Sequence, residues 1–140
     1  MSEFPQGRPT YCSIDHDALR WNVEQIRQRI GPPTKILCMV KANGYGHGAA
    51  AVAPTLASAG SDAFGVATLE EGIELRRAGI TQTILVVGGA FSDQLADFFT
   101  HALTPVVHDL DGLCDLEEAV RSRRATLEVH LKIDTGMGRL

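Results

Sequence analysis

Hydrophobic and polar residues near the start of this chain alternate with a helical period. The sequence predicts one helix that ends before Pro32, because Asp15 is a suitable N-cap and Gly31 a suitable C-terminal residue. Apolar side chains three or four residues apart would form its buried face. These side chains are Leu19, Val23, Ile26 and Ile30.

Further along the chain, short apolar runs of β-prone residues alternate with more helical patterns. The predicted strands cover residues 36–40, 63–67, 84–87, 105–108 and 127–134. The predicted helices between them cover residues 48–60, 68–79, 92–100 and 112–123. Thr68 and Glu71 form a capping-box pattern at the start of one helix, and Ser92 is expected to cap the next.

Strands that alternate with helices of this length predict an α/β fold with parallel βαβ units. A five-stranded doubly wound sheet would fit 140 residues, whereas a complete (β/α)8 barrel needs about 250. The sequence stops a few residues after the fifth predicted strand, and no helix follows to cover that strand. We therefore expect residues 1–140 to be the amino-terminal part of a (β/α)8 TIM-barrel domain, with about five β/α units.

The first predicted strand ends in a lysine, Lys41, and then in a loop rich in glycine. Ligands of α/β proteins bind at the carboxyl ends of the strands, so Lys41 would deliver an amine where chemistry is expected. Loss of hydration beside an apolar strand favours the neutral amine, which can form a covalent bond with a carbonyl carbon. A lysine whose amine simply reaches solvent at the strand end is the alternative.

The glycine loop also permits a second interpretation. Gly44, Gly46 and Ala49 match the dinucleotide-binding pattern G-x-G-x-x-A, and the acids Glu70 and Glu71 follow about twenty residues later. A ring at position 45 would crowd the space that a pyrophosphate needs, which argues against this match. The nucleotide-binding domain nevertheless remains an alternative at this point.

Two long motifs resemble those of a known family. Residues 40–48, Val-Lys-Ala-Asn-Gly-Tyr-Gly-His-Gly, resemble the pyridoxal 5'-phosphate (PLP) attachment motif of alanine racemases, and residues 129–140, which contain Lys-Ile-Asp-Thr-Gly-Met-Gly-Arg, resemble that family's second signature. The similarity begins near Ile14 and covers nearly all of the chain. It implies a longer barrel and a following β-rich domain, both absent from this sequence.

The resemblance implies roles for four residues. Lys41 would be the catalytic lysine that also binds PLP, and Tyr45 would donate its hydroxyl to the cofactor phosphate. Arg139 would contact the cofactor's phenolic oxygen and the substrate carboxylate, and Lys132 would be the carbamylated lysine that holds it in place. His47 is expected to be a structural hydrogen-bonding group in the loop.

The fifth predicted strand supports an interior rich in polar groups. Its apolar and polar residues alternate, and successive side chains of a strand point to opposite faces of the sheet. The apolar residues would therefore lie on one face and the polar residues on the other. The apolar set is expected to face the helices and the polar set the barrel interior, where Lys132 and Lys41 would converge. An antiparallel strand with one wet face is the alternative. The polar set is Glu128, His130, Lys132 and Asp134.

Composition excludes several classes of protein. A net charge of -4 without a basic patch argues against nucleic-acid binding, and no apolar run approaches the ~20 residues of a membrane span. The start of the chain lacks a signal segment, so a cytoplasmic location is expected. The three cysteines are far apart in the sequence and are expected to be reduced, and no metal-binding pattern is present.

The function implied by the resemblance is racemisation of L- and D-alanine, which supplies D-alanine for peptidoglycan. In the family, a tyrosine from the partner subunit of a homodimer acts on the opposite face of the substrate, and it lies beyond Leu140. Residues 1–140 alone are therefore expected to be inactive. The alternatives are a racemase of serine or another amino acid, and a non-catalytic PLP-binding barrel protein that handles cofactor supply.

Overall fold

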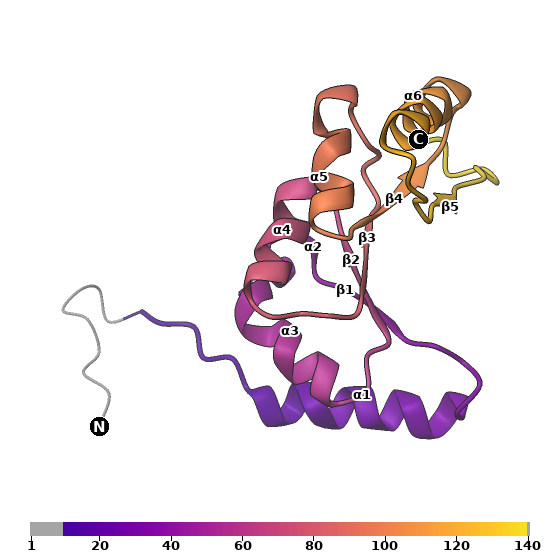
Figure 1. The fold of residues 1–140 in the computed structure, drawn as a ribbon. Coiled ribbons are helices and arrows are strands. Elements are labelled where there is room, and N and C mark those ends of the chain that lie inside the picture. Colours follow the sequence, from indigo (N-terminus) through magenta and orange to yellow (C-terminus); the bar gives the residue numbers. More distant parts are fainter. Residues whose placement is uncertain (1–9, 140) are drawn as a thin grey trace.

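The computed structural model describes residues 10–139 and contains one five-stranded parallel sheet (Figure 1). The strands lie side by side in chain order. They are β1 (Leu37–Met39), β2 (Ala63–Val66), β3 (Thr83–Val86), β4 (Thr104–Val107) and β5 (His130–Leu131). A doubly wound sheet reverses its strand order at a switch point, so this sequential order excludes that alternative.

Helices connect the strands. They are α1 (His16–Ile30), α2 (Lys41–Tyr45), α3 (Ala49–Ser58), α4 (Leu69–Arg77), the 3-10 turn η1 (Ser92–Gln94), α5 (Leu95–Thr100) and α6 (Leu110–Arg123). Between residues 10 and 139, none of these helices is long and apolar enough to cross a membrane.

Side-chain caps explain where three of the helices, α1, α4 and α6, begin. The Asp15 carboxylate accepts hydrogen bonds from two N–H groups at the start of α1, and Thr68 and Glu71 form the predicted capping box of α4. The prediction for Ser92 is wrong, because it begins η1 and its hydroxyl caps nothing there. Helix α6 begins at Leu110, two residues earlier than predicted, because Asp109 caps it.

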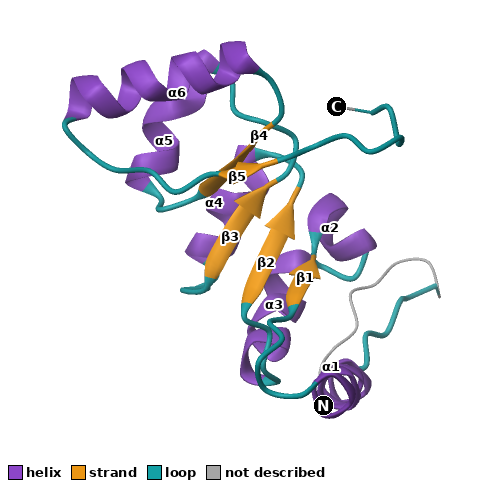
Figure 2. Cartoon of the chain, turned by 90° about the vertical axis from the view of Figure 1, so that its right-hand side faces the viewer, coloured by secondary structure: helices purple, strands orange, loops and turns teal. Residues whose placement is uncertain are grey.

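The hydrophobic core lies between the sheet and the helices. Figure 2 shows the helices beside the sheet, and alternate residues of the central strands are almost completely buried in this core. They are Phe64, Val66, Ile84 and Val86, which pack with Leu75, Phe98 and Leu103. We call the other side of the sheet, turned away from the helices, the inner face. Helices on one face and strands in chain order are typical of an arc of a (β/α)8 barrel.

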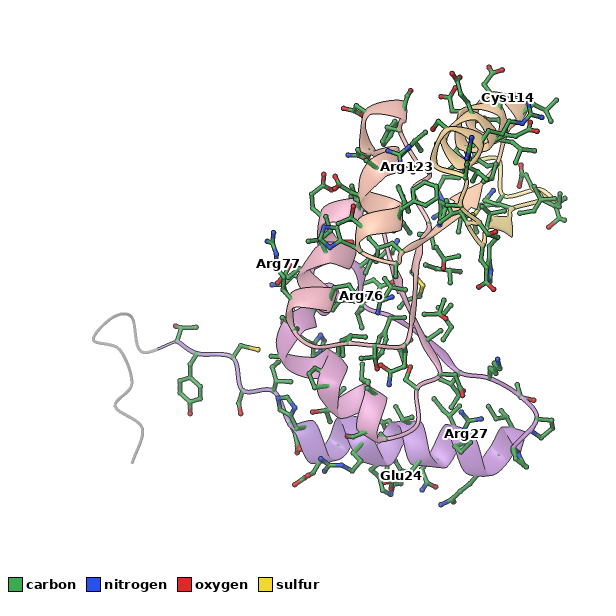
Figure 3. The ribbon with its side chains drawn as sticks, in the orientation of Figure 1. Glu24, Arg27, Arg76, Arg77, Cys114 and Arg123 are labelled. Atoms are coloured by element: carbon green, nitrogen blue, oxygen red, sulfur yellow. The ribbon has the colours of Figure 1, made fainter. Side chains whose placement is uncertain are left out.

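Helix α1 lies near the amino-terminal ends of the strands and packs against α3. Figure 3 shows Arg27 directed from α1 toward the sheet, where it donates a hydrogen bond to the Gly60 carbonyl (2.9 Å) and pairs with Asp62. Val23 is buried, but Ile26 is 50% exposed, so the predicted face of this helix is only partly covered. The Ile36 N–H (2.7 Å) and Arg27 lower the pKa of the Asp62 carboxyl.

The cysteines are free, as predicted. Cys12 and Cys114 are exposed, whereas Cys38 is half-buried and packs against the core from β1. The structure therefore contains no disulfide among its three cysteines.

Candidate active site at the carboxyl edge of the sheet

All five strands are parallel, so their carboxyl ends lie along one edge of the sheet, and Figure 2 shows those of β1, β2 and β3 at the top of the strands. Lys41 lies two residues after the end of β1 and is half-buried. The residue before it, Val40, donates its N–H to the Gly65 carbonyl (2.9 Å) and so continues the pairing of β1 with β2. The backbone of Lys41 is therefore anchored to the sheet on its amino-terminal side.

The chain after Lys41 forms an unusual turn. Four consecutive residues, 42–45, have positive φ angles between 52° and 65°, so α2 winds with left-handed backbone geometry. Only glycine adopts this conformation freely, and each other residue there costs about 1 kcal/mol or more. Ala42, Asn43 and Tyr45 all bear this strain. The glycines of residues 44–48 predicted a loop here, but they did not predict that its backbone would be left-handed.

Hydrogen bonds within the loop support the turn. The Asn43 side-chain oxygen accepts the Ala49 N–H (2.8 Å) at the start of α3, and Asn43 is one of the residues that tolerate positive φ best. The His47 Nδ1 lies 2.8 Å from the Gly44 carbonyl oxygen. His47 is thus a structural hydrogen-bonding residue, as predicted.

A carboxylate from the next β/α unit also contacts this turn. One oxygen of Glu71, Oε1, accepts the N–H of Ala42 at 2.7 Å, and the other, Oε2, accepts the N–H of Ala67 at 2.7 Å. Both oxygens are therefore used by the protein's own backbone. The dinucleotide interpretation required an acid at Glu70 or Glu71 that binds a ribose, and the contacts of Glu71 leave it no role of that kind.

Tyr45 ends the left-handed turn and is 60% exposed. The turn therefore brings two of the predicted site residues, Lys41 and Tyr45, to the same corner of the sheet. Ala67 directly follows β2, the strand next to β1, and the alternation along β2 places it on the inner side. This small side chain covers little of the inner face beside β1.

The predicted strand over residues 127–134 is much shorter in the structure. Only His130 and Leu131 form β5, because β4 is its one neighbour in the described chain and pairs with it at two positions. Leu131 and Ile133 are each 68% exposed, since no described helix covers them. Long period-two patterns therefore do not ensure a long strand at a sheet edge.

The register of β5 confirms which way its residues face. His130 pairs with Val106, whereas Leu131 pairs with Val107, which packs against the helices. Because partners across a parallel sheet point to the same side, His130 faces the inner side and Leu131 the helical side. Lys132, whose N–H donates to the Val107 carbonyl (2.8 Å), continues this alternation on the inner side.

The loop after Lys132 is organised by a carboxylate. Asp134 accepts hydrogen bonds from the N–H groups of Gly136 (3.1 Å), Met137 (3.0 Å) and Gly138 (3.0 Å). The N–H groups of Gly138, Gly136 and Met137, together with the charge of Lys132, lower the pKa of the Asp134 carboxyl. Arg139, which is exposed, directly follows this loop.

The structure thus brings the four predicted residues together in two pairs. Lys41 and Tyr45 lie at the end of β1, and Lys132 and Arg139 follow β5. Four strand spacings of about 4.8 Å separate the two ends by roughly 19 Å along the sheet. A closed barrel would turn both pairs toward one interior, and their convergence stays a prediction.

Sequence reasoning missed the contacts of two carboxylates. Glu71 was recognised as a capping residue, but its bond to Ala42 joins residues 29 positions apart and leaves no local signal. Asp134 was assigned only to the polar face of a strand. The signal that could have revealed its role is an aspartate followed by a Thr-Gly-Met-Gly run, which is typical of a turn closed by the side chain.

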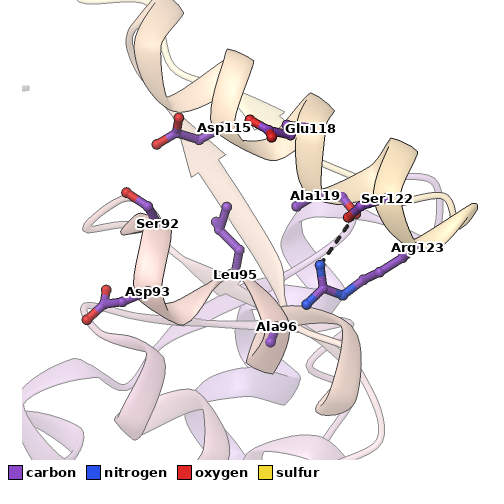
Figure 4. Close-up of a pocket in the computed structure, with 9 residues that line it drawn as sticks. All are labelled: Ser92, Asp93, Leu95, Ala96, Asp115, Glu118, Ala119, Ser122 and Arg123. Carbon is purple, nitrogen blue, oxygen red and sulfur yellow. Dashed lines mark hydrogen bonds between the residues drawn. The ribbon is translucent and has the colours of Figure 1, made fainter.

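A groove on the helical side of the molecule is separate from this edge (Figure 4). It lies between the start of α5 and helix α6, with Asp93, Asp115 and Glu118 on its rim. Arg123 lies over the Phe99 ring, 5.1 Å from its centroid, and directs its guanidinium toward the Ala119 carbonyl. None of the four predicted site residues lines this groove.

Comparison with known proteins agrees with this geometry. The family model for the alanine racemase N-terminal domain matches residues 14–140. This chain belongs to that family. Alanine racemases of Lactobacillus delbrueckii subsp. bulgaricus and of Synechocystis sp. are 42% and 44% identical to it, over 134 and 131 residues. The matches cover 96% and 93% of this chain, and 36% and 35% of those relatives.

Solved structures of alanine racemases have the same fold. That of Clostridium difficile 630 has a TM-score of 0.83 and 37% identity, over 88% of this chain and 32% of the other. That of Bartonella henselae, solved with covalently bound pyridoxal phosphate, has a TM-score of 0.84 and 27% identity, over 90% and 37%. The chain thus spans about a third of the alanine racemases it matches. The predicted TIM-barrel arc is confirmed.

Proposed function

We propose that this chain is the amino-terminal part of a PLP-dependent alanine racemase, and that Lys41 holds the cofactor and moves the substrate's Cα proton. The observation that carries this proposal is the position of Lys41. It stands at the carboxyl end of β1, where the next four residues turn left-handed and keep the chain close to the edge. The names of the relatives support alanine as the substrate.

The groups at this edge fit PLP chemically. The cofactor has an aldehyde, a phenolic oxygen and a phosphate, which call for an amine, a cationic donor and hydroxyl or N–H donors. Lys41 supplies the amine, the exposed Tyr45 supplies a hydroxyl four residues later, and Arg139 supplies a planar guanidinium. The small side chain of Ala67, directly after β2, would leave the inner face beside the amine open to a ring.

PLP, when bound, supplies a conjugated ring that accepts electron density from the substrate Cα. The chain's own residues then have three tasks. The Lys41 amine attaches the cofactor and, once released by the substrate amine, is positioned to remove or return a proton at Cα. Tyr45 orients the phosphate through its hydroxyl. Arg139 holds the substrate carboxylate, which fixes the orientation of the Cα–H bond.

Lys132 and Asp134 would support Arg139. Carbamylation would convert the Lys132 amine from a cation to an anion, which would form an ion pair with the arginine. Three N–H groups bond to Asp134 in the intervening loop, and this loop would position Arg139, which follows it. We propose that these residues act as one unit across the barrel from Lys41.

The remaining parts of the proposal concern the whole protein. We propose a homodimer in which a tyrosine of the partner subunit serves the opposite face of Cα, since racemisation requires removal on one face and return on the other. The matched part of the relatives is only about a third of their length, and we propose that this tyrosine belongs to the rest of the protein. The enzyme would act in the cytoplasm, and its product, D-alanine, would be used to make peptidoglycan.

The first experiment locates the cofactor. The full-length protein is loaded with PLP, treated with borohydride and analysed by peptide mapping, and we expect covalent cofactor on Lys41. Alanine is then incubated with the protein in heavy water, and we expect deuterium at Cα. Lys41→Ala should abolish the covalent cofactor and reduce the exchange by about 10³-fold or more.

Lys35 offers a matched control. It is an exposed lysine just before β1, and Lys35→Ala removes the same functional group without touching the carboxyl edge. We expect this variant to retain both the cofactor and the exchange. Cofactor attached at another lysine would refute the role of Lys41, and attachment at Lys41 without Cα exchange would indicate a carrier of PLP rather than a racemase.

A further inference from the structure

Glu71 joins the Lys41 turn to the second β/α unit. Its Oε1 accepts the Ala42 N–H at 2.7 Å, and its Oε2 accepts the N–H groups of Ala67 (2.7 Å) and Thr68 (3.4 Å). We propose that Glu71 is a positioning residue, which holds the backbone immediately after Lys41 and so fixes where its amine lies. This inference rests on the function proposed above.

The need for such a contact follows from the strain in the turn. Ala42 is the first residue with positive φ, at 52°, and alanine has no side chain with which to stabilise that conformation. Other hydrogen bonds of the turn, such as Gly44 N–H to the Val40 carbonyl (2.8 Å), run between residues of the first β/α unit. The bond from Ala42 to Glu71 instead connects the turn to the end of β2, because Glu71 also accepts the Ala67 N–H.

Lys41 consequently lies between two anchors. On its amino-terminal side, Val40 bonds to Gly65 of β2, and on its carboxyl-terminal side, Ala42 bonds to Glu71, which also binds the end of β2. Both anchors lead to the same neighbouring strand. Loss of Glu71 would leave the first anchor intact and free the turn, so that the lysine amine would sample a wider range of positions.

The position of Glu71 also makes it well suited to this task. It is the third residue of α4 and closes the capping box with Thr68, so its backbone is held by a helix that packs into the core. A negative charge in the first turn interacts favourably with the helix dipole, and an ionised carboxylate accepts stronger hydrogen bonds than a neutral group. Its two oxygens therefore form a rigid bridge between the two units.

The test compares Glu71→Ala and Glu71→Gln with two matched controls in the full-length protein. Thr68→Ala removes the hydroxyl that accepts the Glu71 N–H (3.4 Å), and so weakens the cap of α4 while leaving the bond to Ala42 in place. Glu70→Gln removes the neighbouring charge from the same helical turn, where the Glu70 carboxylate interacts with the Gln94 side-chain amide (3.3 Å), the Thr68 side chain and its own N–H.

Two measurements separate positioning from stability. The first is amide hydrogen exchange of residues 42–46 in protein without PLP, which we expect to accelerate about 10-fold or more in Glu71→Ala, the effect of losing one charge-assisted hydrogen bond. The second is the rate at which PLP becomes covalently attached to Lys41, with kcat and KM for alanine. Attachment and kcat should fall about 10-fold while KM changes little.

Glu71→Gln should show a smaller change of the same kind, because its amide keeps one oxygen but presents N–H groups where the second was. If Glu71→Ala does not fold, the same two measurements on Glu71→Gln test the inference. Thr68→Ala and Glu70→Gln should match the unmodified protein in both measurements. If the Glu71 variants exchange and attach PLP no differently from Thr68→Ala, Glu71 is only a helix cap and the inference is wrong.

Failure of the inference is distinguishable from failure of the proposed function. If the unmodified protein carries no PLP on Lys41, the proposed function fails. Hydrogen exchange without PLP still reports whether Glu71 holds the turn, because it requires no cofactor. If exchange accelerates but attachment and kcat do not change, the turn is held by Glu71 without consequence for the amine, and the positioning role is refuted.

Discussion

Arg76 makes the densest set of polar contacts at the end of the molecule opposite the candidate site. Its guanidinium donates hydrogen bonds to the carbonyl oxygens of His101 (3.0 Å), Ile80, Gln82 and Ala102 (2.7 Å each). The first and last acceptors precede β4, and the other two precede β3. Arg76 therefore joins the end of α4 to the starts of two strands, and its removal should destabilise the fold.

The structure allows the size of this effect to be worked out. Three of the four bonds are partly buried and one is exposed to solvent, where water can replace the lost donor. A hydrogen bond to a charged group contributes about 1.5–3 kcal/mol when buried, and partial exposure reduces that to about 1 kcal/mol each. Arg76→Ala should therefore lower the free energy of unfolding by about 3 kcal/mol.

The next residue in the chain, Arg77, is a matched control. Figure 3 shows that Arg76 is directed toward the sheet, whereas Arg77 points away from it into solvent. Arg77→Ala should change the free energy of unfolding by about 0.5 kcal/mol or less. Urea unfolding of both variants and of the unmodified protein provides the comparison. Equal stability of the two variants would refute the role given to the Arg76 network.

Two further predictions concern a glycine and a carboxylate. Gly88→Ala should destabilise the protein by about 2 kcal/mol, because the new Cβ would lie 2.4 Å from the Ala67 carbonyl oxygen, which is part of the backbone; an unchanged melting temperature would contradict this. The pKa of Asp62 lies below its ordinary value of 3.8, since the Ile36 N–H and Arg27 favour the ionised form. Its contribution to stability is therefore present above that pH and lost as the pH falls through the lower, folded-state pKa. Asp62→Asn should flatten this part of the stability profile, and identical acid profiles for the two proteins would rule the contribution out.

Much of the fold could be predicted because its signals are local. The caps at Asp15 and Thr68 lie within three residues of the N–H groups they bind, and the apolar runs of β1 to β4 were found within one or two residues of their ends. The alternation after residue 127 also predicted correctly that His130 faces away from the helices. Patterns of period two and 3.6 report such features directly.

Features that depend on distant neighbours were not predictable in the same way. The strand order that excluded a doubly wound sheet is a property of pairing between units, and the short β5 reflects the lack of a second neighbouring strand in the described chain. Exposure of Ile26 depends on which elements reach α1, not on the period of α1 itself. Each of these is a tertiary outcome that more than one local pattern permits.

The candidate site shows the same division. The sequence by itself determined that Lys41 ends a strand and precedes a glycine-rich loop, because strand propensity and glycine content are properties of the residues themselves. Only the tertiary structure decided that the loop turns left-handed at Ala42 and that Glu71 accepts the Ala42 N–H. A strained backbone conformation persists only where surrounding contacts compensate its free energy, and those contacts come from a part of the chain 29 residues away.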